Sequence, residues 1–148
     1  MSTTEKIKKW VIAELGQASA VKAITGSPGP VWTSGDDFPS RTGVYIRADT
    51  ATRAERFSDT SRFELWCVAT VDEQQAFDLM TAVRVALDAN AGFSKGWKAS
   101  PGSLGLRLNS IRIEEEIPPD KMPNPDQKTY WLGVLRYEIK GKDAALPA

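Results

Sequence analysis

The densest group of side chains that could do chemistry is the acidic run Glu114, Glu115 and Glu116. Carboxylates hold hard cations when several of their oxygens converge on one point. Side chains alternate between the two faces of a strand, so a strand here would place Glu115 opposite the other two. We therefore expect a solvated strand end rather than a metal site. Asp36 and Asp37 have no third acidic ligand nearby and receive the same interpretation.

Nucleophilic chemistry has few candidates in this chain. There is no histidine, which excludes Ser–His and Cys–His nucleophile pairs and histidine metal sites. Cys67 is the single cysteine, and its place in a strand pattern favours a small buried hydrophobe over a reactive thiol. Gly26, Gly29 and Gly35 do not form a phosphate-binding loop, and residues 102–105 lack the flanks of a nucleophile elbow. We expect no catalytic residues, no metal, no cofactor and no enzymatic activity.

Arginines offer a second kind of site. Arg53, Arg56 and Arg62 could contact phosphates, but acidic residues such as Glu55 and Glu64 are interleaved with them. A mesh of surface ion pairs is the better interpretation. Over the whole chain, 19 Lys and Arg balance 19 Asp and Glu. A net charge of zero argues against general binding to nucleic acids or to membrane surfaces.

The 148 residues predict a single domain over residues 1–140 and a flexible tail over residues 141–148. Hydrophobic residues make up 41% and charged residues 26%, which is typical of soluble globular proteins. No apolar run approaches the roughly 20 residues of a membrane helix. The N-terminal segment lacks the apolar stretch of a signal peptide. We therefore expect synthesis in a cytoplasm and no membrane partner.

The most regular pattern lies in residues 62–89, RFELWCVATVDEQQAFDLMTAVRVALDA. Its first part alternates with a period of two and predicts a strand. The expected apolar face consists of Phe63, Leu65, Cys67, Ala69 and Val71. A helix follows, capped by Asp72. Its expected apolar stripe consists of Phe77, Met80, Val83 and Leu87, widened by Ala76, Leu79 and Ala86.

Around this unit the chain divides into a few further elements. Before it we expect a helix over residues 3–15 that stops at Gly16, a short helical turn over 18–24, a long Gly/Pro-rich loop over 25–43, a strand over 44–48 and a polar connection over 49–59. After it come a loop over 91–103 and a strand whose alternation changes phase near Asn109 and Ser110, which predicts a bulge. Residues 117–128 contain four prolines and should not form a regular strand, and the last strand covers 129–140.

These elements predict an α+β fold with the order α-β-β-α-β-β. The economical packing is a twisted, mostly antiparallel four-stranded sheet with two helices on one face and long loops. The other face would carry Trp66, Val68 and Val134. Either a partner covers this half-apolar face, or the long loops shield it. The sequence favours neither alternative.

Several large apolar side chains fall in the predicted loops or on the uncovered face, where water contact is costly. They are Trp32, Phe38, Phe93, Trp97, Met122 and Trp66. They either fold back over the core or anchor a neighbouring subunit. We take these six residues as the candidates for a subunit interface.

The order of these elements resembles that of the tail terminator, or tail completion, proteins of long-tailed bacteriophages. The likeness covers an N-terminal helix, a Gly/Pro-rich loop before VYIRAD, the strand–helix unit of residues 62–88 and the closing strand YWLGVLRYEIK. The resemblance implies a ring of identical subunits, typically a hexamer, on the head-proximal end of the tail tube. The implied partners are the tail tube protein and the head-completion or connector protein, with DNA passing through the lumen without specific binding.

The expected location is therefore the neck region of a virion assembled in a host cytoplasm. Two other interpretations remain open. A head–tail joining or neck protein would share the size, the location and the ring habit. A small non-enzymatic ligand-binding α+β domain, dimeric through its open sheet face, belongs to a different class.

Overall fold

A computed structural model describes residues 3–26, 31–32, 41–54, 59–91, 98–99, 106–123 and 129–143. The chain begins with two helices, α1 (Thr3–Gln17) and α2 (Ser19–Thr25), followed by β1 (Val31–Trp32). The strands β2 (Gly43–Ala54) and β3 (Asp59–Ala69) lead into the long helix α3 (Glu73–Ala91). The remaining strands are β4 (Lys98–Ala99), β5 (Leu106–Pro123) and β6 (Thr129–Asp143).

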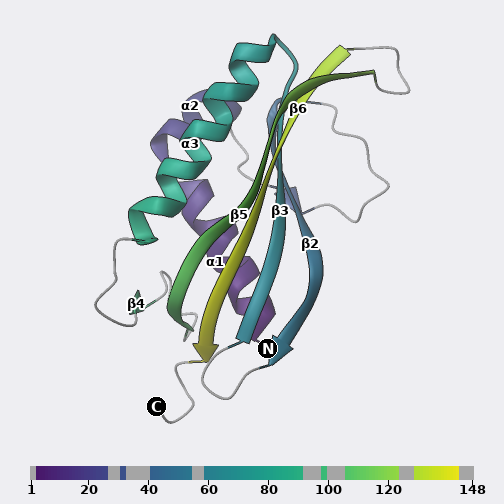
Figure 1. The fold of residues 1–148 in the computed structure, drawn as a ribbon. Helices are drawn as coiled ribbons and strands as arrows, with labels where there is room; N and C mark the ends of the chain where they lie inside the picture. Colours follow the sequence, from purple (N-terminus) through teal and green to yellow (C-terminus); the bar gives the residue numbers. More distant parts are fainter. Residues whose placement is uncertain are drawn as a thin grey trace.

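The strands form one sheet in the order β1-β2-β3-β6-β5-β4. β2, β3, β6 and β5 are long and pair antiparallel with their neighbours, whereas β1 and β4 are two-residue strands at the edges. The helices lie together on one side of the sheet (Figure 1). The expected α+β fold is confirmed, with α2 in place of the short helical turn and the two edge strands as additions.

The core lies between the helices and the sheet. α1 contributes an apolar stripe at helical spacing, Ile7, Trp10, Val11 and Leu15. From α3 and the sheet come Leu79, Met80, Val83, Leu87, Ile46, Phe63, Leu65, Cys67, Leu135, Tyr137 and Ile139. Because α1, α3 and all four long strands feed one cluster, the elements stabilise one another.

Hydrogen bonds around Gln75 fix the connection from β3 to α3. The Asp72 Oδ1 accepts from the backbone N–H of Gln75 at 2.8 Å, which confirms Asp72 as the cap of this helix. The Gln75 Oε1 accepts from the backbone N–H of Val71 and from Thr42 Oγ1, both at 3.2 Å. Thr42 Oγ1 also accepts from the backbone N–H of Thr70 at 3.1 Å. The start of β2 is thereby tied to the end of β3 and to the first turn of α3.

Two apolar positions were expected in the core and are exposed. Val71 is 67% exposed because β3 ends at Ala69 and the alternation stops there. Phe77 is 41% exposed because the buried stripe of α3 is centred on Leu79 and Val83, and Phe77 lies beside it.

Four expected boundaries were also wrong. α1 runs past Gly16 to Gln17, so this glycine does not end the helix. β2 continues to Ala54 and β3 begins at Asp59, so strands occupy most of the predicted polar connection. Register shifts between Ala48 and Thr50, and between Thr50 and Arg53, show that this stretch of β2 is irregular. β6 runs to Asp143, which places the first three residues of the predicted tail in the sheet, while residues 144–148 lie outside the described ones.

For the strand β5, the sequence predicted one feature correctly and another incorrectly. A register shift between Leu108 and Ser110 confirms the predicted bulge. However, β5 continues through Pro118 and Pro119 to Pro123, although we expected no strand there. A second shift, between Ile117 and Asp120, accommodates the two prolines. Proline lacks an N–H and is tolerated on this strand because β6 is its only described neighbour over this stretch.

β5 and β6 extend beyond the rest of the sheet (Figure 1). The last pair between β3 and β6 is Ala69 with Trp131. β5 and β6 continue past it with Met122 opposite Tyr130 and Pro123 opposite Thr129. We call this extension of β5 and β6 the hairpin arm.

Candidate functional site

The candidate site is the open face, the side of the sheet that points away from the helices. Leu135, Tyr137 and Ile139 of β6 point into the core, so the residues between them lie on the open face. The strand register carries this assignment to the neighbouring strands. One cross-strand row contains Arg47, Glu64, Arg136 and Glu115, and a second contains Arg62, Glu138 and Arg112, with Glu114 beside them. We call these eight residues the charged ladder.

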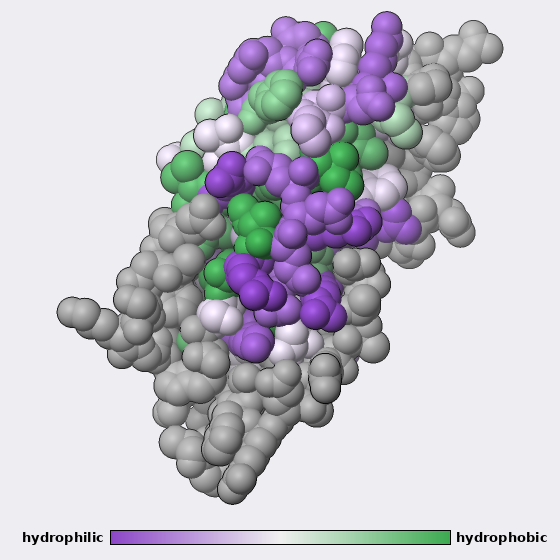
Figure 2. All heavy atoms as spheres, in the orientation of Figure 1, coloured by the Kyte–Doolittle hydropathy of each residue, from purple (hydrophilic) through white to green (hydrophobic). Residues whose placement is uncertain are grey.

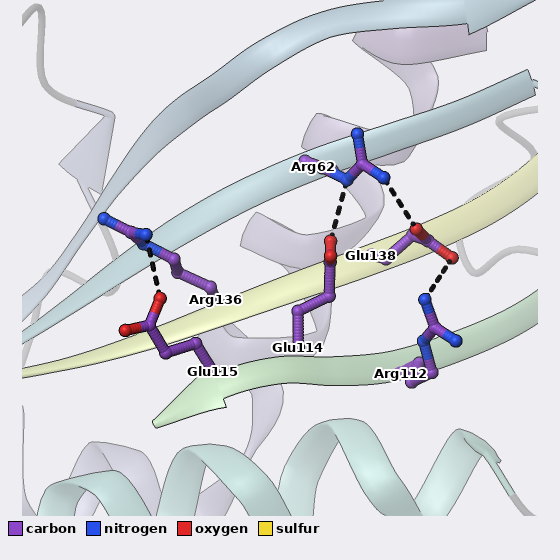
Figure 3. Close-up of polar contacts among 6 residues, drawn as sticks. All are labelled: Arg62, Arg112, Glu114, Glu115, Arg136 and Glu138. Atoms are coloured by element: carbon purple, nitrogen blue, oxygen red, sulfur yellow. Dashed lines mark hydrogen bonds and ion pairs between the residues drawn. The ribbon is translucent and has the colours of Figure 1, made fainter. Parts of the chain in front are cut away.

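The ladder is held by ion pairs across the strands (Figure 3). Arg136 lies between two carboxylates, with Nε 3.3 Å from Glu64 and Nη1 2.9 Å from Glu115. Arg62 likewise reaches Glu114 at 2.8 Å and Glu138 at 3.2 Å.

Glu138 lies at the centre of the second row. Its side chain is only 8% exposed, and its other oxygen is 3.3 Å from Arg112 Nη2. A carboxylate this buried needs its charged partners, because burial removes the water that would otherwise solvate it. Four arginines and four glutamates balance, so the ladder carries no net charge.

A bulge in β5 determines which face of the sheet each glutamate of the run Glu114–Glu116 lies on. Between Ile113 and Glu115 the register shifts by one residue, which brings both Glu114 and Glu115 to the open face. Glu116 therefore lies on the helix side, where it is 3.2 Å from Arg84 of α3. The expectation that Glu115 would point away from the other two was wrong, because the extra residue breaks the alternation. The three carboxylates still do not converge, since each binds a different arginine.

Toward the hairpin arm the open face becomes apolar. Trp66 lies at the boundary, with the Arg47 guanidinium 4.5 Å from the centre of its ring and its Nε1 donating to Glu64. This is cation–π geometry. Beyond it, Val68 and Val134 are buried, whereas Ile117 is 37% exposed. The apolar half is thus partly covered and partly open to solvent.

The surroundings of two side chains shift their pKa values. The hydrogen bond to Glu114, and then the charge of that carboxylate, raise the pKa of Arg62. Burial in the core raises the pKa of the Cys67 thiol, which agrees with its interpretation as a buried hydrophobe. Among the residues that the structure describes, no three His, Cys, Asp or Glu side chains are placed to hold a metal ion. None of the described helices is long and apolar enough to cross a membrane.

The six interface candidates from the sequence are distributed widely. Met122 is 38% exposed on the hairpin arm, and Trp66 is half-buried within the contacts just given. Trp32 belongs to β1, where its backbone lies opposite Ile46. Phe38, Phe93 and Trp97 lie outside the described residues.

Sequence reasoning missed the ladder as a whole. Its signal was present as charged residues two apart in three strands: Arg62 and Glu64, Arg112 and Glu114, and Arg136 and Glu138. Residues two apart share a face of a strand, and opposite charges directly across from each other attract. Arg62 does form ion pairs, but its partners are Glu114 of β5 and Glu138 of β6 rather than the acidic residues interleaved with it in the sequence. Glu55 and Arg56 lie outside the described residues.

No family model matches this sequence, and no curated protein matches it. Solved structures do share its fold. A chain from a structure described as the virion of a native gene transfer agent (GTA) particle superimposes with a TM-score of 0.55. The match covers 89% of this chain and 92% of that chain at 14% sequence identity. A second solved structure aligns over 94% of this chain and 96% of that chain at 17% identity, with a TM-score of 0.41, too low to support an argument.

Proposed function

We propose that this chain is a structural subunit of a phage-like particle. The observation that carries the proposal is the fold that it shares, over nearly the whole of both chains, with a chain of the gene transfer agent virion. The sequence pattern of residues 62–88 supports the same class of protein. The narrower role that we propose is that of a tail terminator, whose subunits form a ring on the head-proximal end of the tail tube.

The proposed mechanism is capping. A terminator binds the last ring of tube subunits and occupies the surface where the next subunit would add, so the tube stops growing. Its opposite side then receives the head-completion or connector protein. The hairpin arm supplies reach for one of these contacts, because β5 and β6 extend past the end of β3. The bonds around Gln75 hold α3 in a fixed orientation while the arm makes contact.

DNA would pass through the lumen of such a ring. Attraction to phosphates grows with the number of basic groups that neutralise them. The open face has eight charged ladder residues with no net charge, and the whole chain is neutral. Such a surface favours passage of DNA over retention, whichever face lines the lumen.

The decisive experiment is to delete the gene in the encoding phage or prophage and to examine lysates by electron microscopy. A terminator predicts overlong tail tubes, and a wild-type copy in trans should restore their length. Tails of normal length beside unattached, DNA-filled heads would instead assign the chain to head–tail joining. Normal, intact particles would overturn both roles and leave the ligand-binding class.

A further inference from the structure

The outer side of α3 has a pattern of exposure that is symmetric about Thr81. From Phe77 to Val85, the first two positions, the middle one and the last two are exposed, and the four positions between them are buried. α3 runs along one side of the molecule (Figure 1), and both hydrophilic and hydrophobic side chains lie along that side (Figure 2). Because residues three and four apart are neighbours on a helix surface, the exposed positions form one outward stripe.

The side chains of this stripe are complementary about the same centre. Phe77 and Val85, 41% and 61% exposed, lie four residues before and four residues after Thr81. Asp78 and Arg84 lie three residues before and after it, are both exposed and carry opposite charges. A two-fold axis through Thr81 would pack α3 antiparallel on an identical helix. Phe77 would then lie against Val85 and Asp78 against Arg84, and each contact would occur twice.

The contacts that these charged groups make within the chain leave them able to bind across the axis. Arg84 Nη1 lies 3.2 Å and 3.4 Å from the two carboxylate oxygens of Glu116, and the two side chains are 45% and 43% exposed. A guanidinium has five N–H donors, so Arg84 can bind a second carboxylate as well. Asp78 Oδ1 accepts from Gln74 Nε2 at 2.9 Å, and a carboxylate accepts several hydrogen bonds through its two oxygens.

We propose that α3 is the contact surface of a homodimer in which the outward stripes of two copies of this chain pack antiparallel. The apolar and charged residues each contact a different residue of the second copy, and Thr81 lies on the axis and meets its own copy. This isologous contact closes with two subunits, so it differs from the head-to-tail contacts that build a ring. The inference therefore does not rest on the proposed function.

The size of the stripe predicts a weak dimer. A contact made by one helix is smaller than the roughly 800 Å² per partner of a standard interface. We expect a dissociation constant on the order of 10 μM or weaker. Sedimentation of the purified chain over a concentration series up to about 1 mM covers this range. Circular dichroism verifies that each variant is folded.

Replacing the residue on the axis gives the most direct test. Thr81→Glu places two carboxylates opposite each other, so dimerisation should weaken at least about tenfold. Ser19→Glu makes the same change in charge at an exposed position of α2 and should dimerise as the native chain does. If Thr81→Glu does not fold, Val85→Glu replaces it, since it places a carboxylate against Phe77 and beside Asp78 of the second copy.

A charge swap tests the pairing of Asp78 with Arg84. Asp78→Arg and Arg84→Asp should each weaken the dimer at least about threefold, because like charges then face each other across the axis. The double variant restores opposite charges in both pairs, so its dissociation constant should return to within about threefold of the native value. Arg84→Asp also loses the exposed contact with Glu116 in both variants, and this loss cannot produce the recovery.

Cross-linking tests the position of the axis. Thr81→Cys brings two thiols together across it, and mild oxidation should join the two copies by a disulfide. The native Cys67 is buried in the core. Glu73→Cys is the matched control, since the exposed residue 73 lies about 12 Å along the helix from the axis and should not cross-link.

Three results would overturn the proposal: a native chain that is monomeric at every concentration, a dimer that Thr81→Glu leaves unchanged, or a double charge swap that dimerises as weakly as the single variants. Tail length tests the proposed function separately. Overlong tails after gene deletion, together with a monomeric purified chain, would support the terminator role and refute this dimer. Normal tails together with recovery in the double variant would do the reverse.

Discussion

Glu138 shows how the ladder can contribute to stability although most surface ion pairs contribute little. It is 8% exposed and contacts both Arg62 and Arg112. Glu115 is 50% exposed and forms an ion pair with Arg136. Exposed pairs are worth about 0–1 kcal/mol, whereas a buried charged group that loses its partners costs considerably more. The two glutamates are therefore chemically alike and energetically different.

We expect Glu138→Gln to lower the free energy of unfolding by about 2 kcal/mol, because two guanidinium groups lose their shared carboxylate. Glu115→Gln is the matched control and should cost less than about 1 kcal/mol. Urea unfolding followed by circular dichroism measures both. Equal losses would mean that burial of Glu138 adds nothing to its ion pairs.

Because the thiol of Cys67 is buried, we expect the free energy of unfolding to depend on pH. Burial raises the thiol pKa in the folded chain, so the folded state keeps this proton after the unfolded state has released it. Above the ordinary thiol pKa of about 8.5, the unfolded state binds fewer protons, and the free energy of unfolding falls as pH rises. The slope from this one group approaches about 1.4 kcal/mol per pH unit.

The measurement is urea unfolding at several pH values from neutral to alkaline. Cys67→Ala lacks the thiol and should lose stability less steeply above pH about 8.5, although its small cavity lowers stability at every pH. The two chains differ only at residue 67, so contributions from the rest of the chain cancel in the comparison. Parallel curves for the two chains would contradict the prediction.

At the scale of elements, the junction between β3 and α3 predicts coupling between two side chains. The Gln75 Oε1 accepts hydrogen bonds from Thr42 Oγ1 and from the backbone N–H of Val71. Thr42→Val and Gln75→Ala should each cost about 1 kcal/mol. The double variant should cost less than their sum, because both single changes break the same bond. Gln74→Ala is the control, since the exposed Gln74 side chain donates to the exposed Asp78 one turn along the helix, and losing this bond should cost about 0.5 kcal/mol or less.

The strand β5 explains what the sequence could and could not predict about the elements. The bulge near Asn109 was predictable because leucines and isoleucines before and after it change phase. The bulge near Glu114 was not predictable, because three consecutive glutamates include no apolar residue that would reveal a change in the alternation. The extension past Pro118 depended on β6 being the only described neighbour of β5 over this stretch, and pairing order is a property of the whole sheet.

The same division holds for the candidate site. The apolar face of β3 and the stripe of α1 follow from periodicity, and the structure confirms both apart from Val71. The ladder required the register of four strands, since Glu138 of β6 meets Arg62 of β3 and Arg112 of β5, which are far apart in the sequence. Local pattern determines which face a residue lies on, and only tertiary pairing determines which charges meet.

At the scale of the whole molecule, the shared core predicts a single cooperative unit. Trp10 of α1 belongs to the same buried cluster as Leu135 of β6. Trp10→Ala should cost about 3–5 kcal/mol, a large part of the 5–15 kcal/mol typical of a domain. Trp10→Phe should cost much less, and the exposed Lys9→Ala should remain within about 0.5 kcal/mol of the native chain.

Whether the chain unfolds cooperatively determines which elements lose stability in Trp10→Ala. If α1 and the sheet unfold together, far-UV circular dichroism and tryptophan fluorescence give coincident urea transitions for the native chain, and both shift equally in Trp10→Ala. If α1 were a separate layer, the helical signal would be lost first and the sheet would keep its native midpoint. We expect coincidence, because α1 packs against α3 and three strands of the sheet and has no core of its own.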